Sequence, residues 1–433
     1  MFTPSTYARY RALGPDSPCR MVSIQERRRI LASLSGSLSA GEIFALISSG
    51  AVDTRASIAR VTGLSRSTVS ERLDALFDAR LIREAADAQP TGGRPSKTLQ
   101  VNEDGFLALA ADVGEDHIRL VVTDLNAGIL AESVTAIAVT EGPSVALEWI
   151  AAEARKLVTG LSRTVDDLLG LGLSVPAPVD FAHGEVVAPS VMTGWDGVDI
   201  QAEFRRLLDI PVLVENDVNA RGLGEFLLAW RNYDQVFYVK AGTGIGSAIL
   251  TGGSLFRGAQ GAAGDVGHIR LEPQDGPLCR CGAIGCVEAL GAGWAINRDL
   301  SGAGFAVEST RDSIELVRAG KPEAIHRIRE SGRIIGRAIA YCVNLLNPSL
   351  VVVGGSLTEA GEHLLMGVRE SVYQYSLPLA TRELEVVRAQ GDDRCGAVGA
   401  AHLVISRALE PDRVNDRIRL LQNAGAGSSN SSA

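Results

Sequence analysis

The feature that most limits the fold of this chain is a regular alternation of two sequence patterns that begins near residue 106. From there onward, short apolar runs typical of strands alternate with stretches of helical period. The runs that predict strands lie at residues 118–124, 170–175, 212–214, 236–240, 248–250 and 350–353. This alternation of strands and helices predicts an α/β architecture for most of the chain.

The segment before this region is different, because residues 38–84 read as compact and entirely helical. Residues 54–70 predict a helix, a tight turn and a second helix, in which Gly63 permits the turn and Ser65 caps the second helix. The apolar side of the first helix is expected to consist of Ala56, Ile58, Ala59 and Val61. On the second helix, helical spacing places one apolar group together: Val69, Leu73, Leu76 and Phe77.

A helix-turn-helix of this kind predicts a DNA-reading surface at the start of its second helix, because a recognition helix presents its N-terminal residues to base edges. The candidate DNA contacts on this helix are Ser65, Arg66, Ser67, Thr68 and Arg72. Residues 79–84 and 91–101 predict a β-wing that brings Arg94 and Lys97 near phosphates. Three acidic residues on the exposed side limit DNA contact to the helix start: Glu71, Asp74 and Asp78. The alternative is a plain helical hairpin with a charged loop.

The charge distribution favours the DNA-reading interpretation. Residues 1–100 hold 14 Lys+Arg and 9 Asp+Glu, a charge of +5, so the totals of 42 and 51 leave 28 and 42, a charge of −14, for the remainder. A basic module on an acidic body is typical of a nucleic-acid reader attached to a domain of another kind. An ordinary fluctuation in surface charge is the alternative.

Three of the six cysteines lie within eight residues, at positions 279, 281 and 286, and His268 lies shortly before them. One imidazole and three thiolates form a closed Cys₃His set, which is typical of a structural zinc site. We therefore predict one structural Zn²⁺ per chain, bound by His268, Cys279, Cys281 and Cys286. Gly282 and Gly285 let the short loop fold around the metal. Three unrelated buried thiols and a core histidine are the alternative.

Four further segments stand in a fixed order around this cluster: 110–114 (AADVG), 214–220 (VENDVNA), 241–246 (AGTGIG) and 351–355 (VVVGG). Together with the cysteine–histidine signature, they resemble the ROK family, which comprises repressors, open reading frames and sugar kinases. The resemblance covers the chain from about residue 40 to about residue 405, the helix-turn-helix included. It implies two α/β lobes of the actin/hexokinase-like (ribonuclease H-like) ATPase fold, with ligand in the cleft between them.

The resemblance also implies a sugar site. In ROK sugar kinases an Asn-Asp pair after a strand binds sugar hydroxyls, and its aspartate is the catalytic base; Asn216 and Asp217 match this pair. The family's Glu-x-Gly-His segment and the glutamate after the last cysteine also contact sugar. His268 and Glu288 match, whereas Asp265 replaces the usual glutamate and is one methylene shorter. Leaving a buried hydroxyl partner unmatched is costly, so such a set confers selectivity.

The first phosphate loop argues against kinase activity. Active members carry Asp-x-Gly-Gly-Thr, whereas this chain carries Glu115 and Asp116 after Asp112-Val-Gly114. Two carboxylates at this loop oppose the binding of phosphate oxygens. We therefore expect a sensor in which Asp217 is a vestigial base, and not an enzyme. An active sugar kinase with an appended DNA module is one alternative, and a ligand-independent DNA-binding protein is another.

These patterns predict five segments. They are a flexible extension (1–25), a winged helix-turn-helix (26–90), a wing and linker (91–103), a ROK sensor domain (104–408) and a flexible C-terminal tail (409–433). The apolar runs are too short to span a bilayer, and no signal peptide is evident, so a cytoplasmic location without a membrane partner is expected. The predicted partners are operator DNA, a sugar or sugar-derivative effector, and further copies of the chain in a dimer or a dimer of dimers.

Overall fold

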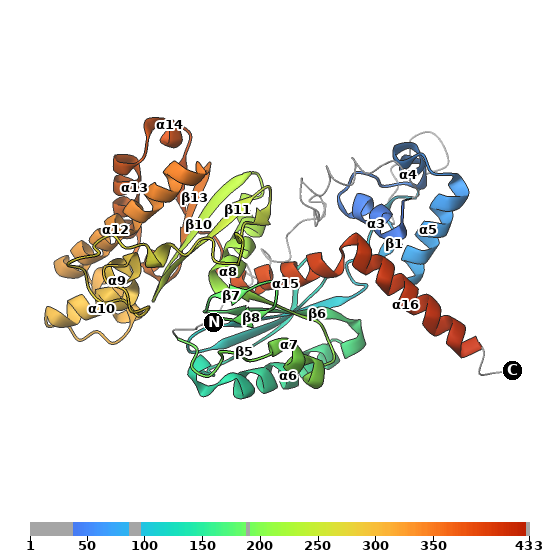
Figure 1. The fold of residues 1–433 in the computed structure, drawn as a ribbon, viewed down its shortest axis with the longest axis horizontal. Coiled ribbons are helices and arrows are strands. Elements are labelled where there is room, and N and C mark those ends of the chain that lie inside the picture. Colours follow the sequence, from blue (N-terminus) through green and yellow to red (C-terminus); the bar gives the residue numbers. More distant parts are fainter. Residues whose placement is uncertain (1–37, 86–96, 188–190, 430–433) are drawn as a thin grey trace. The chain divides into compact units, whose positions relative to one another are not determined.

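The computed structural model describes residues 38–85, 97–187 and 191–429, which group into two compact units (Figure 1). Of the described residues, those up to 173, those at 199–213 and those from 400 onward form unit 1, and those at 174–198 and 214–399 form unit 2. Each unit is built on a five-stranded sheet, so the predicted α/β class is confirmed. The expected extension at 1–25 lies outside the described residues. None of the described helices is long and apolar enough to cross a membrane.

The N-terminal part of unit 1 is a helix-turn-helix followed by a two-stranded sheet. Its elements are α3 (Ala40–Ser48), α4 (Arg55–Thr62), α5 (Arg66–Asp78), β1 (Ile82–Glu84) and β2 (Leu99–Val101). Strands β1 and β2 pair in antiparallel register, with Ile82 opposite Val101. They supply the two predicted strands of the wing, although the segment between them lies partly outside the described residues.

The larger part of unit 1 is a sheet in the order β5-β4-β3-β6-β9. Its first three strands form an antiparallel meander, and β6 is buried at all eight residues, as expected of a strand covered on both faces. The strands and the helices that accompany them are β3 (Leu107–Val113), β4 (Ile118–Thr123), β5 (Ile129–Thr135), η1 (Val139–Glu141), α6 (Pro143–Gly160), η2 (Val165–Asp167), β6 (Leu168–Val175), α7 (Ile200–Leu207) and β9 (Val212–Asn216).

The sheet of unit 2 has the order β12-β11-β10-β13-β14. When the strands of each sheet are numbered in chain order, both sheets read 3-2-1-4-5, so the two units repeat one topology. Strand β10 pairs antiparallel with β11 and parallel with β13. The strands of unit 2 are the short hairpin β7 (Val179–Asp180) and β8 (Glu185–Val186), then β10 (Gln235–Ala241), β11 (Ile245–Thr251), β12 (Ser254–Leu255), β13 (Leu350–Gly354) and β14 (Glu385–Arg388).

The helices of unit 2 enclose an apolar core that continues from β10 and β13 into the long helices α12 and α13. All five residues of β13 are buried, which fits a parallel strand inside the sheet. The helices are α8 (Asp217–Glu225), η3 (Phe226–Trp230), η4 (Val266–His268), α9 (Val287–Gly291), α10 (Gly293–Gly302), α11 (Thr310–Arg318), α12 (Pro322–Leu346), η5 (Ser356–Ala360), α13 (Glu362–Tyr375) and α14 (Pro378–Thr381).

The C-terminal segment differs from the flexible tail expected at 409–433. Helix α15 (Cys395–Ala408) is followed by α16 (Pro411–Ser429), which Figure 1 shows in red and which packs on α3. The Asn415 side chain accepts a hydrogen bond from the Gly41 N–H at 2.9 Å, and a Cβ at Gly41 would lie 2.0 Å from the Pro411 carbonyl oxygen. Burial of Val414 and Ile418 in this contact stabilises a helix that the Gly- and Ser-rich sequence end does not suggest.

Candidate functional site

Local capping positions the predicted recognition helix. Gly63 has a φ of 70°, in the left-handed region, and ends α4, so the turn is possible because this residue has no Cβ. The Ser65 hydroxyl accepts a hydrogen bond from the Thr68 N–H at 3.2 Å and so caps α5. Of the expected apolar residues of α4 only Ile58 is buried, whereas on α5 the buried residues are Val69, Leu73 and Leu76. The helix-turn-helix therefore forms as predicted, with a smaller apolar contribution from α4.

The start of α5 leaves Arg66 exposed, whereas the other predicted DNA contacts on this helix interact with neighbouring side chains. The Arg66 side chain is exposed at the first position of the helix. The Ser65 hydroxyl lies 2.8 Å from that of Ser67 and 2.9 Å from that of Thr68, so these three hydroxyls already contact one another. Arg72 lies 3.6 Å from Glu71. Arg66 is therefore the cation that is best presented for contact with a base.

Of the two predicted DNA contacts in the wing, the structure describes Lys97. Lys97 lies beside β2 and forms an ion pair with Glu84 of β1. Because the Lys97 side chain is 72% exposed, exchanging this carboxylate for a phosphate would require little rearrangement. The other predicted wing contact, Arg94, lies outside the described residues.

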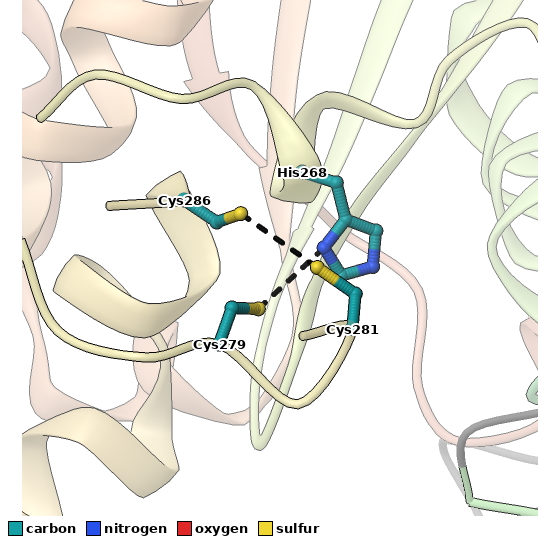
Figure 2. Close-up of side chains that lie close together, drawn as sticks. All are labelled: His268, Cys279, Cys281 and Cys286. Atoms are coloured by element: carbon teal, nitrogen blue, oxygen red, sulfur yellow. Dashed lines mark hydrogen bonds between the residues drawn. The ribbon is translucent and has the colours of Figure 1, made fainter. Parts of the chain in front are cut away.

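Four metal-binding side chains meet in unit 2 (Figure 2). One ligand atom from each of them lies within 4.8 Å of the others, so the cluster can hold a metal ion. The Cys281 and Cys286 sulfurs are 3.8 Å apart, and the Cys279 sulfur is 3.7 Å from His268 Nδ1. Nδ1 therefore faces the thiols, which leaves His268 Nε2 available for a different partner. The cluster consists of the predicted residues His268, Cys279, Cys281 and Cys286.

A short folded loop brings the three cysteines together. The Cys279 N–H donates to the Ala283 carbonyl at 2.8 Å, and Leu278 pairs with Ile284 in an isolated bridge. Gly285 has a φ of 75°, and a Cβ there would lie 1.8 Å from the Glu272 carbonyl oxygen. The predicted need for glycine at this position is thus explained by both backbone conformation and close approach.

The thiols of the cluster do not ionise equally without a metal. Burial raises the pKa of Cys286 to about 12 and also raises the pKa of Cys279. Burial opposes ionisation of Cys281 as well, but the Ala283 N–H and the neighbouring thiols outweigh it and lower the pKa of Cys281. A metal that binds these sulfurs as thiolates must therefore release protons, so its affinity falls as the pH falls.

The predicted Asn-Asp pair lies where β9 passes into α8. The Asn216 side-chain oxygen caps α8 by accepting from the N–H groups of Val218 and Asn219 at 3.0 and 3.2 Å, and its amide donates to the Ala177 carbonyl at 3.0 Å. One amide hydrogen of Asn216 therefore stays available for a ligand. Asp217 opens the helix and binds Lys240, whose Nζ lies 2.5 Å from Asp217 Oδ2.

Glu288 follows the cysteine loop (279–286) and contacts the glycine-rich turn (241–246) between β10 and β11. Its carboxylate accepts from the Ile245 N–H at 3.1 Å and from Trp294 Nε1 at 3.4 Å. A Cβ at Gly244 would lie 2.9 Å from Glu288 Oε2, so the turn approaches this carboxylate closely. Asp265 is exposed directly before η4, the short helix that contains His268. Glu288 therefore follows Cys286 of the cluster closely in α9, and Asp265 precedes His268 of the same cluster.

Sequence reasoning missed two ion pairs around these residues. One is the pair of Lys240 with Asp217. The other joins Arg257 Nε to buried Glu215 at 2.7 Å, and the Arg257 guanidinium lies 3.9 Å from the centre of the Phe181 ring. Glu215 also accepts from the Asn219 side chain at 2.9 Å. The Arg257 pair thus ties the loop before Asp265 to the end of β9, but its partners lie too far apart in sequence for a local motif.

The segment that was predicted to be an altered phosphate loop forms the turn between β3 and β4 in unit 1. The Gly114 N–H donates to the His117 carbonyl at 2.8 Å, and Asp116 lies 2.7 Å from His117 Nδ1. The side chain of Asp116 is 89% exposed, and Glu115 is exposed beside it. Both carboxylates therefore face solvent at the tip of this turn.

Comparison with known proteins agrees with the resemblance seen in the sequence. A model of the ROK family matches residues 108–407. A putative xylose repressor of Caldicellulosiruptor sp. is 30% identical over 380 residues, which cover 83% of this chain and 94% of that protein. A glucokinase of Thermotoga maritima is 32% identical over 255 residues, which cover 55% of this chain and 79% of the kinase.

A solved structure shows the same fold. The crystal structure of a ROK family transcriptional regulator, a homologue of the E. coli MLC protein, has a TM-score of 0.74 and covers 88% of this chain and 98% of its own. Its sequence is 24% identical, so this likeness concerns the fold. The match to the repressor spans most of both proteins, whereas the match to the kinase covers about half of this chain.

Proposed function

The chain belongs to the ROK family, and we propose that it is a DNA-binding transcriptional repressor whose operator affinity responds to a sugar or sugar derivative. One observation carries the proposal: a helix-turn-helix with an exposed Arg66 stands in the same chain as a ROK domain that keeps Asp217, His268 and Glu288. The relatives named repressors support a regulator that is not an enzyme.

The metal of the cluster is, in this proposal, one structural Zn²⁺. Two sulfurs bound tetrahedrally to zinc at about 2.3 Å lie roughly 3.8 Å apart. The sulfurs of Cys281 and Cys286 are 3.8 Å apart, so this pair fits zinc without rearrangement. Since all four positions would be taken by protein, the ion would have no open site for catalysis and would hold His268 and Glu288 in place.

The sugar would bind through the residues that the family pattern places in the site: Asn216, Asp217, Asp265, His268 and Glu288. Carboxylates accept hydrogen bonds from sugar hydroxyls, and the free amide hydrogen of Asn216 and Nε2 of His268 donate them. We further propose that α15 passes the signal on, because its first residues belong to unit 2 and its last to unit 1. It continues into α16, which contacts α3, and a coupling of about 1–3 kcal/mol is typical of such links.

A homodimer is proposed because regulators of this kind pair two half-sites through two-fold symmetry. Unit 2 offers an exposed apolar surface where the end of α12 meets the segment after α13. Asn344 of α12 binds the Tyr375 carbonyl and the Leu377 N–H at 3.1 and 2.9 Å. The most exposed apolar side chains there are Leu345, Leu377 and Leu379, at 83%, 66% and 73%. Exposure of this extent on adjacent segments favours contact with a second copy.

The proposal is tested by selecting binding sites from a random DNA pool and titrating the selected sequence. We expect a palindromic operator whose affinity falls steeply with salt, because phosphate contacts release counterions. A panel of sugars and phosphosugars is then screened by thermal shift, since a ligand at 100 times its Kd stabilises the native state by about 2.7 kcal/mol. The effective sugar must weaken operator binding. Failure to enrich any sequence would contradict the regulator assignment.

A sugar kinase is the second candidate, because the glucokinase of T. maritima is 32% identical and Asp217 occupies the position of the family's base. We expect no ADP formation from ATP with D-glucose or D-xylose, because Glu115 and Asp116 oppose phosphate in the β3–β4 turn. A coupled ADP assay, with the T. maritima glucokinase as positive control, measures this. Sugar-dependent turnover that disappears in Asp217→Asn would establish the kinase instead.

A further inference from the structure

The ion pair of Lys240 with Asp217 is one of the features of unit 2 that the family pattern does not explain. Lys240 is the sixth residue of β10, and Asp217 is the first of α8. The Asp217 side chain is 14% exposed and that of Lys240 is 32% exposed, so the pair is partly buried but can be reached from solvent. We propose that Lys240 is a ligand-binding residue of the sugar site. It donates a hydrogen bond to one sugar hydroxyl, and Asp217 accepts a hydrogen bond from the neighbouring hydroxyl. This inference rests on the proposed sugar sensing.

The neighbours of Lys240 in the sheet leave its side chain uncovered. Lys240 lies opposite Gly246 on β11 and opposite Gly354 on β13. A Cβ at Gly246 would lie 2.8 Å from Val218 Cγ2, and a Cβ at Gly354 would lie 2.6 Å from the Tyr238 hydroxyl. Because both flanking positions lack side chains, the lysine can extend toward the start of α8 without a cross-strand neighbour above it.

The candidate sugar site has few hydrogen-bond donors, and Lys240 can supply them. The candidate site is rich in carboxylates, which only accept, whereas each sugar hydroxyl can both donate and accept. Asn216 has already committed its oxygen to the cap of α8 and one amide hydrogen to Ala177. Glu288 accepts from the Ile245 N–H and from Trp294. Lys240 has three N–H donors, of which Asp217 takes one, so two are left for hydroxyl oxygens of a ligand.

The same pair orients Asp217. As a carboxylate held by an ammonium group, Asp217 is an acceptor whose position depends on the lysine. Lys240 therefore acts both as a ligand contact and as the residue that positions Asp217.

The test compares Lys240→Met with Lys321→Met, which removes an exposed lysine at the start of α12. The probes are D-xylose and D-glucose, each titrated by calorimetry against the metal-loaded full chain. For the probe that binds the wild type, Lys240→Met should raise Kd by a factor on the order of ten or more, because a charged hydrogen bond is lost. Lys240→Arg should recover part of this loss, and Lys321→Met should leave Kd unchanged.

A measurement on the wild type covers the case in which Lys240→Met does not fold. The bound sugar should protect Lys240, but not Lys321, from acetylation by an amine-reactive reagent, as followed by mass spectrometry. Two results would overturn the assignment. One is an unchanged Kd in a folded Lys240→Met variant, and the other is an extent of Lys240 acetylation that is the same with and without sugar. If neither probe nor any other sugar of the panel binds the wild type, the proposed sugar sensing is contradicted, and the proposed role of Lys240 is contradicted with it.

Discussion

Replacing Cys281 by serine is expected to release the metal ion and to abolish the response to sugar. A serine hydroxyl is a far weaker zinc ligand than a thiolate, and Cys281 has the lowered pKa within the cluster. Its sulfur lies 3.8 Å from that of Cys286, whose backbone leads directly into α9 and Glu288. Without the metal, the loop that holds Glu288 against the Ile245 N–H loses its anchor. The zinc content measured by elemental analysis should therefore fall from about one ion per chain to near zero.

Cys342→Ser is the matched control for this variant. Cys342 lies within α12, outside the cluster, and burial raises its pKa to about 11. The Cys342→Ser variant should keep its metal and its sugar response. Operator binding without sugar should survive in both variants, because α3, α4 and α5 belong to unit 1. Full metal content in Cys281→Ser would show that the assigned ligand set is incorrect.

The parts of the fold that could be predicted from sequence are those fixed by local signals. Gly63 and Ser65 define the turn before α5 and the cap of α5 because each acts on its immediate backbone. The three cysteines that can hold a metal lie within eight residues, and a short loop that returns on itself brings them together. The strands were found because β10 and β13 are nearly continuous apolar runs.

The features that were missed depend on contacts between distant residues. Lys240 is 23 positions from Asp217, and a lysine near the end of a strand does not indicate an ion pair. Helix α16 was expected to be flexible because its end is rich in Gly and Ser, yet the packing of its first turns on α3 stabilises it. Beside it, the Phe106 ring lies under two guanidinium groups, those of Arg417 at 4.2 Å and Arg80 at 4.9 Å.

Two further substitutions should separate DNA reading from sugar sensing. Arg66→Ala removes the exposed cation at the start of α5. If Arg66 makes a bidentate contact with a guanine, the variant should lose about 1–3 kcal/mol of operator binding and lose preference at that base pair. Its sugar response should remain, because residue 66 lies in unit 1 and the candidate sugar residues lie in unit 2. Titration of the selected operator and of single-base variants, with and without sugar, measures both properties.

Asp217→Ala should show the opposite behaviour. It removes the central acceptor of the candidate sugar site and frees Lys240 from its ion pair. Loss of this ion pair should not destabilise unit 2 strongly, since the Lys240 side chain is 32% exposed and can be hydrated. Operator affinity without sugar should stay near that of the wild type, and the effect of sugar should vanish. Asp234→Ala, which removes an exposed carboxylate of the same unit, should keep the full response. A full response in Asp217→Ala would place the sensing site elsewhere, whereas the assignment of Arg66 to DNA would stand, because it depends only on the helix-turn-helix.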